Sequence, residues 1–120
     1  MTDWAALVGR CLLAALLLLG AAQKIADPGP AQDLLAMRGL LPALIWPAAV
    51  FNLAAGVLLA VGALTRPIAV LAAAYCAATS VFHFIPDDGW QMSIFVKNWT
   101  IAGGFLMLAA HGPGRHAVRP

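Results

Sequence analysis

Residues Trp46 to Leu64 read WPAAVFNLAAGVLLAVGAL and contain no charged side chain. A helix needs about 20 mostly apolar residues to span a lipid bilayer, and this run comes close to that length. Three further runs resemble it, over Trp4–Ala22, Pro67–Ile85 and Ile94–Ala110, and most charged residues fall between the runs. We therefore predict an all-α, polytopic membrane protein in which residues 1–120 form a single domain, a bundle of four transmembrane helices.

The composition of the chain agrees with this fold class. Hydrophobic residues make up 62% of the chain and charged residues 10%, with a mean hydropathy of +0.87, whereas a soluble domain usually has about 25% charged residues. The net charge of +2 comes without a basic run or an aromatic–basic pattern. The composition therefore indicates a chain that lies in a lipid membrane and argues against nucleic-acid binding.

Proline and glycine mark the end of the first predicted helix. This helix covers about Trp4–Ile25 and is broken by Pro28, Gly29 and Pro30. The segment Ala31–Leu41 that follows is amphipathic and too short to span a membrane. We therefore expect a short interfacial helix between the first and second transmembrane helices.

The remaining helices are bounded in the same way. The second helix begins at about Pro42 or Trp46 and ends before the turn Thr65-Arg66-Pro67. Because that turn is very tight, the second and third helices must be antiparallel neighbours. The third helix is expected to end at Pro86, and the fourth stops at Gly112–Gly114.

The first run has an alternative interpretation as a signal peptide. Cys11–Ala22 could be its apolar core, because small residues stand at the end of this stretch. The segment before it, however, carries Asp3 as well as Arg10, whereas signal peptides begin with a basic segment. We expect the first helix to be retained.

Four spans place both termini on one side of the membrane. The arginines on that side are Arg10, Arg66, Arg115 and Arg119, and the basic residues of the other side are Lys24, Arg38 and Lys97. The positive-inside rule counts these residues and, at four against three, favours cytoplasmic N- and C-termini. We predict a multi-pass protein of a bacterial-type cytoplasmic (inner) membrane.

Helical periodicity indicates which face of each span turns inward. Small residues let membrane helices approach each other, and polar residues hydrogen-bond between them. The predicted inward rows are Arg10, Ala14, Leu17, Ala21 and Lys24; Ala48, Asn52, Gly56 and Ala60; Ala72, Cys76, Thr79 and His83; and Lys97, Gly104 and His111. The residues expected to pack the helices are Asn52, Gly56, Gly103 and Gly104. Cys11 and Cys76 are expected to be buried thiols that pack as small apolar residues.

The polar side chains of the spans are unevenly distributed. Lys24, His83, Lys97 and Asn98 lie toward the side away from the termini, and no Asp or Glu lies deep inside a span. The outer half of the bundle is thus predicted to be a cationic, hydrogen-bond-donating pocket, which suits a quinone carbonyl oxygen or a small oxyanion. The sequence assigns no catalytic residue. No metal site is expected, because no Cys or His cluster has ligand spacing.

Each candidate residue also has a structural explanation. Lys24 and Lys97 could extend toward the interface as snorkelling side chains, and Arg10 could anchor the cytoplasmic end of the bundle. His83 could be a packed interfacial histidine, and Asn52 could hydrogen-bond between helices. The sequence alone leaves these explanations open.

The order of landmarks along nearly the whole chain resembles the DoxX family of small four-helix membrane proteins. The landmarks are Arg10; Gly20 with Lys24 and Asp27-Pro28; Arg38-Gly39-Leu40-Leu41-Pro42; Gly56 to Gly62 closing on Leu64-Thr65-Arg66; Phe82-His83; Val96-Lys97-Asn98; and Gly103-Gly104 before His111-Gly112-Pro113-Gly114-Arg115. One departure concerns Asn52, which stands where the family typically has a Glu in the second helix. This departure removes a potential proton carrier.

The resemblance implies a role in membrane redox chemistry, by analogy of fold. Some members look like subunits of thiosulfate:quinone oxidoreductase, and others are associated with membrane oxidoreductase assemblies and with thiol or oxidative-stress handling. We therefore expect a redox-associated subunit that binds a quinone headgroup or a small sulfur oxyanion near the outer face. Lys97, His83 and Asn98 would supply hydrogen bonds, with Lys24 and Arg10 in support. No flavin, haem or metal motif is visible in the sequence, so a partner subunit or a soluble electron donor is implied.

Two other functions stay open. A non-catalytic structural or accessory subunit would dock through its small-residue faces against a larger respiratory or photosynthetic membrane complex. A small anion transporter would require homo-oligomerisation, because four helices leave little room for a pore. A co-purifying quinone, a stoichiometric partner protein or flux into proteoliposomes would separate the three functions.

Overall fold

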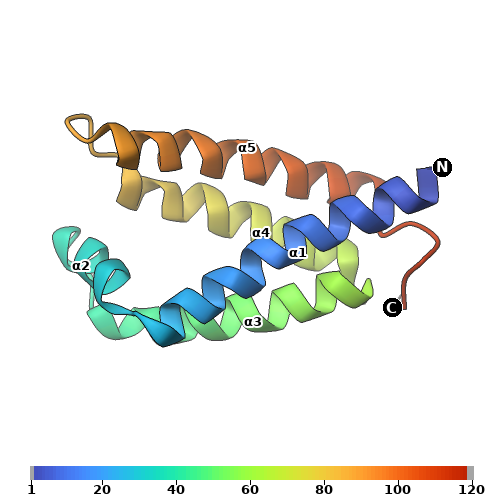
Figure 1. Cartoon of the computed structure of the whole chain (residues 1–120), viewed down its shortest axis with the longest axis horizontal. Helices are drawn as coiled ribbons and strands as arrows, with labels where there is room; N and C mark the ends of the chain where they lie inside the picture. The colour runs from blue at the N-terminus through green and yellow to red at the C-terminus, as the bar shows by residue number, and fades with distance from the viewer. Residues whose placement is uncertain (1, 119–120) are drawn as a thin grey trace.

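A computed structural model describes residues 2–118 as helices joined by short connections (Figure 1). Its elements are α1 (Thr2–Ala26), α2 (Gly29–Met37), the 3₁₀ turn η1 (Pro42–Leu44), α3 (Ile45–Val61), α4 (Thr65–Thr79), the 3₁₀ turn η2 (Ser80–His83) and α5 (Gly89–His111). Four continuous helical segments, built on α1, α3, α4 and α5, are long and apolar enough to cross a membrane. The predicted all-α fold with four spans is confirmed.

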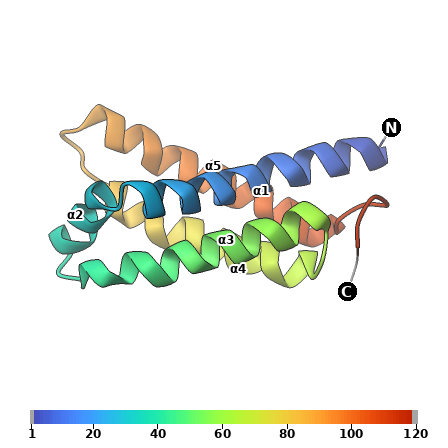
Figure 2. The same cartoon turned by 60° about the horizontal axis from the view of Figure 1, so that its bottom comes forward.

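The helices associate as two pairs. α1 lies along α3, and α4 lies along α5; the pairs join where α3 meets α4 and where α1 meets α5 (Figures 1 and 2). The start of α1 and residues 112–118 lie at one end of the molecule, which we call the termini end. α2 and the α4–α5 connection lie at the opposite end, which we call the loop end (Figure 2).

Small residues make the contact between α1 and α3. Gly56 of α3 is buried, and a Cβ atom added there would lie 2.7 Å from the Leu18 side chain and 3.3 Å from the Ala14 carbonyl oxygen. Helices that approach this closely gain van der Waals contact and exclude lipid. The inward rows predicted for α1 and α3 agree with the burial of Ala14, Leu17, Ala21, Asn52 and Gly56.

The third span ends earlier as an α-helix than the sequence predicts. α4 stops at Thr79 and continues as the tighter turn η2, so the helix does not extend to Pro86. The Thr79 hydroxyl donates to the Tyr75 carbonyl oxygen at 2.7 Å, and the Ser80 hydroxyl donates to that of Ala77 at 2.6 Å. Such hydroxyl bonds compete with the backbone pattern of an α-helix, which accounts for the change at this point.

The fourth helix begins before its apolar run. α5 starts at Gly89 rather than near Ile94, because the Asp88 carboxylate accepts hydrogen bonds from the backbone N–H groups of Trp90 (3.0 Å) and Gln91 (3.2 Å). An aspartate at this position satisfies donors that the first helical turn leaves unpaired. The cap therefore adds a polar first turn at the loop end.

Four residues predicted to lie inward, Gly103, Cys11, Lys97 and His111, are exposed instead. Gly103 of α5 is exposed, and a Cβ atom there would meet nothing within 4 Å, so it does not pack the helices. Cys11 is also exposed, whereas Cys76 is buried as predicted. α5 turns Ala102, Phe105 and Leu108 toward the core instead.

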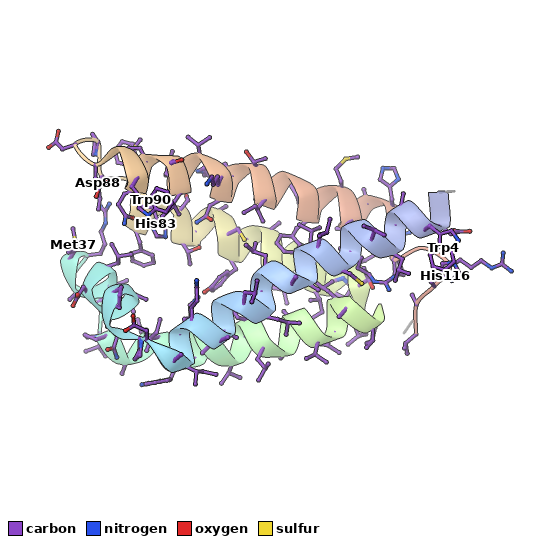
Figure 3. The ribbon with its side chains drawn as sticks, viewed as in Figure 1. Trp4, Met37, His83, Asp88, Trp90 and His116 are labelled. Carbon is purple, nitrogen blue, oxygen red and sulfur yellow. The ribbon has the colours of Figure 1, made fainter. Side chains whose placement is uncertain are left out.

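Exposed tryptophans lie near the ends of the bundle. Trp4 lies at the termini end and Trp90 at the loop end (Figure 3), and both side chains are exposed. Indole rings favour the two membrane–water interfaces. Their positions agree with a bundle whose long axis crosses the bilayer.

The close approach at Gly56 leads to a test of helix packing. Gly56→Leu should lower the free energy of unfolding by about 1–3 kcal/mol, because the added side chain must displace Leu18 or separate α1 from α3. Thermal unfolding in detergent measures the change. Gly103→Leu is the matched control, since that position is open, and it should leave the melting temperature nearly unchanged. Equal tolerance of the two substitutions would contradict the α1–α3 contact.

Candidate functional site

Arg10 is buried at the termini end of the bundle, where it binds segments that are far apart in the sequence. Its side chain is only 2% exposed. Nη1 donates to the carbonyl oxygen of Pro113 at 2.6 Å, and Nη2 donates to those of His116 at 2.8 Å and Ala60 at 3.3 Å. One guanidinium thus joins α1 to the end of α3 and to the segment that follows α5.

Further contacts hold the segment after α5 in place. The backbone N–H of Val118 donates to the Val61 carbonyl oxygen at 2.8 Å. The His116 ring stacks on Trp4, with centroids 4.3 Å apart (Figure 3). Because His83 lies at the loop end (Figure 3), Arg10 cannot support a site that contains His83. That part of the sequence prediction is wrong, and Arg10 is instead the anchor that the alternative explanation described.

Lys24 and Asn52 approach each other in the loop-end half of the bundle. A Cβ atom at Gly20 would lie 2.7 Å from Asn52 Nδ2 and 3.7 Å from Lys24 Nζ. Asn52 is buried, and its Oδ1 has no hydrogen-bond partner within residues 2–118. Gly20 therefore provides the space in which an amide from α3 and an ammonium from α1 meet.

No carboxylate neutralises Lys24 in the part of the chain that the structure describes. Its side chain is half-buried, and the titratable group that acts on it electrostatically is the thiol of Cys76, from α4. The neighbouring Tyr75 packs its ring on Phe51 of α3, with centroids 5.1 Å apart. Lys24, Asn52 and Cys76 thus bring polar groups from three helices to one region, next to an aromatic pair.

His83 has a fixed partner at the loop end. Its Nδ1 lies 2.6 Å from Oε1 of Gln91. Since the amide oxygen can only accept a hydrogen bond, Nδ1 is the donor of this bond. The half-buried ring is held between η2 and the first turn of α5.

Lys97 and Asn98 differ in their surroundings although they are adjacent. Lys97 is exposed, and its Nζ lies 5.7 Å from the ring centroid of Trp90. A cation over an indole near a helix end is typical of a side chain that extends toward the interface. Asn98 is half-buried on the neighbouring face of α5. The structure therefore does not place Lys97 inside the bundle, as the sequence prediction required.

Arg38 fastens α2 to the loop end of the bundle. Its Nη2 donates to the carbonyl oxygens of Val81 at 2.6 Å and Phe84 at 3.2 Å. These oxygens lie at the end of η2, where the helical pattern stops. The short helix α2 is thereby tied to the end of the third span. Sequence reasoning assigned no role to Arg38 or Gln91, because their partners are distant in sequence and, for Arg38, lie in the backbone.

No cluster of three or more His, Cys, Asp or Glu side chains that could hold a metal ion occurs in the described range. The polar groups near Lys24 are three hydrogen-bond donors, an ammonium, a thiol and the Asn52 Nδ2 group, and one unpaired amide oxygen. Such a set can bind a small molecule that carries both an oxygen acceptor and a hydroxyl donor. This set of groups contains no carboxylate that could form an ion pair with Lys24.

Comparisons with known proteins agree on one family. The family model DoxX matches residues 5–84. Inner membrane protein YqjF of Escherichia coli (strain K12) is 31% identical over 120 residues, which cover 98% of this chain and 92% of the relative. Inner membrane protein YphA of the same organism is 42% identical over 73 residues, which cover 56% of this chain and 52% of the relative. No solved structure matches the chain.

The contacts of Arg10 lead to a second test. Arg10→Met should leave the carbonyl oxygens of Pro113 and His116 unpaired and lower the free energy of unfolding by roughly 2–3 kcal/mol, since a hydrogen bond to a charged group contributes about 1.5–3 kcal/mol. It should also release the segment after α5, so trypsin should cut faster after the exposed Arg115. The rate of that cleavage in detergent measures the release.

Arg38→Met is the matched control for this test. It removes an arginine that binds two carbonyl oxygens at the other end of the bundle. Cleavage after Arg115 should therefore stay at the rate of the unaltered protein. If Arg10→Met and the unaltered protein are cut at the same rate, Arg10 does not hold the segment.

Proposed function

Because the chain belongs to the DoxX family, we propose that it is a redox-associated subunit that binds a quinone headgroup between Lys24 and Asn52. The single observation that supports this proposal most directly is that Asn52, whose Oδ1 is unpaired, and Lys24, which has no carboxylate partner among the described residues, both reach the open space at Gly20. The binding region differs from the one that the sequence predicts, because Lys97 is exposed. The participation of His83 and Asn98 stays a prediction.

The unpaired groups favour a ligand over an empty site. An acceptor buried without a partner costs about 1–3 kcal/mol, and a partly buried ammonium without a counter-ion also lacks compensation. A quinol hydroxyl could donate to Asn52 Oδ1, and Lys24 could donate to the second ring oxygen. Binding would therefore pair both groups at once.

The same groups favour the quinone–quinol couple over a sulfur oxyanion. A fully ionised oxyanion and an oxidised quinone have only acceptor oxygens, so each could pair with Lys24 and with Asn52 Nδ2, whereas only a quinol hydroxyl could also donate to Asn52 Oδ1. The Phe51–Tyr75 pair stands one residue along the chain from Asn52 and Cys76 and offers aromatic surface to a ring. The oxyanion is therefore the second candidate ligand.

The redox role requires an electron donor other than Lys24, Asn52 and the residues around them. Conversion of a quinone to a quinol takes up two electrons and two protons, and Asn52 cannot carry a proton as the family's usual Glu could. In this proposal a partner subunit or a soluble donor supplies the electrons, and this chain positions the quinone. No residue of the chain is assigned a catalytic role.

We also propose that the chain lies in the cytoplasmic membrane with both termini in the cytoplasm. The relatives named above are inner membrane proteins. Arg10, Arg66 and Arg115 gather at the termini end, which favours the cytoplasmic side under the positive-inside rule. The Lys24–Asn52 region would then lie in the outer half of the bundle.

An accessory role in a larger complex is the alternative function. The observation that favours it is the exposure of α5, in which only Ala102, Phe105 and Leu108 are buried among its described residues. Such a helix can face lipid or a partner protein. A stoichiometric membrane partner in mild detergent, together with the absence of a quinone, would favour this role.

The proposed site leads to a binding test with decylubiquinone as the probe. Lys24→Met and Asn52→Leu should each raise the Kd about tenfold, because the Lys24 ammonium and the Asn52 Nδ2 group can each donate one hydrogen bond to a quinone oxygen, and its loss is about 1.4 kcal/mol. Quenching of intrinsic tryptophan fluorescence measures the Kd in detergent. Asn52→Leu keeps the number and branching of the side-chain heavy atoms and removes a buried unpaired oxygen, so the melting temperature should stay near that of the unaltered protein.

Lys97→Met serves as the comparison, since it also removes a lysine. Because Lys97 is exposed, its loss should change the Kd less than twofold. A large effect of Lys97→Met with none of Lys24→Met would return the site to the position that the sequence predicts. Failure of the unaltered protein to bind decylubiquinone would sink the quinone proposal.

A further inference from the structure

Two neighbouring cavities lie at the termini end, opposite to the proposed quinone site. One has a volume of about 590 Å³ and is polar; Thr65, Arg66, His111, Arg115 and Asp3 contribute to its wall. The other is an apolar groove of about 400 Å³ between α1 and α5, lined by Ala5, Gly9, Leu12, Leu13, Gly104 and Leu108. Gly112 lines both cavities, so they adjoin.

Basic residues outnumber acidic residues in the lining of the polar cavity, which favours an anionic ligand. Arg66, Arg115 and His111 are among the residues that line it, and Asp3 contributes the one acidic residue of the lining. The N-terminus of α4 also opens into it, and no side chain caps that helix end. An uncapped helix N-terminus presents unpaired N–H groups and a partial positive charge.

Thr65 gives independent support for a ligand at this position. Thr65 is the first residue of α4, and its side chain is only 1% exposed. Its hydroxyl nevertheless has no hydrogen-bond partner within the described residues. Thr65 lines the polar cavity. A buried hydroxyl without a partner carries a cost, which an oxygen-bearing ligand in this cavity would remove.

Arg66 is already oriented for such a ligand. Its Nη1 donates to the carbonyl oxygens of Ala110 at 2.9 Å and Ala109 at 3.3 Å, at the end of α5. Both bonds use Nη1, so Nη2 and Nε can still donate. Two parallel N–H groups of a guanidinium match the oxygens of a phosphate.

The apolar groove decides which phosphate compound fits. Inorganic phosphate would use the polar cavity alone, whereas a phospholipid would place its phosphate there and one acyl chain along the groove. Gly9 and Gly104 keep the groove open, because a Cβ atom at Gly9 would meet nothing within 4 Å and one at Gly104 would meet only Leu13. We propose that the termini end of the bundle is a binding site for one anionic phospholipid.

The test uses the full chain in detergent and native mass spectrometry. The probes are dioleoyl phosphatidylglycerol, dioleoyl phosphatidylcholine and inorganic phosphate. Phosphatidylglycerol should be retained at one molecule per chain, and phosphatidylcholine, whose headgroup has no net charge, should be retained at least fivefold less. Arg115→Gln should weaken retention of phosphatidylglycerol about fivefold, and Asp3→Asn should strengthen it by a similar factor, since one charge near a headgroup has about that effect.

Gly9→Leu tests the acyl-chain part of the site. A Cβ atom at Gly9 meets nothing within 4 Å, and Gly9 lines the groove, so the leucine should reduce phosphatidylglycerol retention while leaving the melting temperature of the lipid-free protein nearly unchanged. Gly103→Leu places the same side chain on the exposed face of α5 and should not alter retention. Together the two variants separate a lipid in the groove from a general effect of a larger residue.

Three results would overturn the proposal. Equal retention of phosphatidylglycerol and phosphatidylcholine would show that charge is not recognised. Thermal stabilisation by inorganic phosphate that equals that by phosphatidylglycerol, with no effect of Gly9→Leu, would identify a phosphate site without a lipid chain. A dimer that Gly9→Leu disrupts would show that a second copy of the chain occupies the groove.

Discussion

The structure depends on the pairing of polar groups in a place where water is absent. The interior of a bilayer offers no hydrogen-bond partners, so polar groups of a membrane protein must be paired within the chain or with a ligand. Arg10 meets this requirement at the termini end, where one guanidinium binds carbonyl oxygens from the end of α3 and from the segment after α5. Since these segments are far apart in sequence, Arg10 fixes the end of the bundle, and small residues such as Gly56 set the distance between α1 and α3 along it.

The two ends of the bundle differ in how completely they meet this requirement. At the termini end Nη1 and Nη2 of Arg10 are paired, but Arg10 Nε and the Thr65 hydroxyl, which lies next to a cationic cavity, have no partner among the described residues. At the loop end Arg38 ties α2 to η2, while Asn52 and Lys24 lack the partners that their burial calls for. We therefore place a ligand at each end, a quinone headgroup near Lys24 and an anionic lipid near Thr65. The protein in this account is a small scaffold that holds a redox-active molecule in the membrane for a partner that supplies electrons.

The sequence was sufficient to predict the four spans and the DoxX family, because long apolar runs and the order of landmarks are properties of the chain itself. It also predicted the inward faces of α1 and α3, where small residues and one polar residue recur at helical spacing. It failed for α5, whose polar and apolar residues are not separated onto opposite faces, so periodicity did not distinguish the face of Lys97 and Gly103 from that of Ala102 and Phe105. The role of Arg10 as an anchor could only be named as an alternative, since its partners are backbone carbonyl oxygens without a sequence signature. The meeting of Lys24 and Asn52 required the packing of α1 on α3.

The central claim, that a quinone binds between α1 and α3, is tested most directly by photo-crosslinking. A quinone with a photoreactive azido group would be added to the full chain in membranes, activated by light and located by peptide mass spectrometry. The account predicts saturable labelling of the peptides that contain Lys24 and Asn52, which an excess of decylubiquinone should suppress. Labelling concentrated around Lys97 on the exposed face of α5, or labelling that decylubiquinone does not suppress, would contradict it.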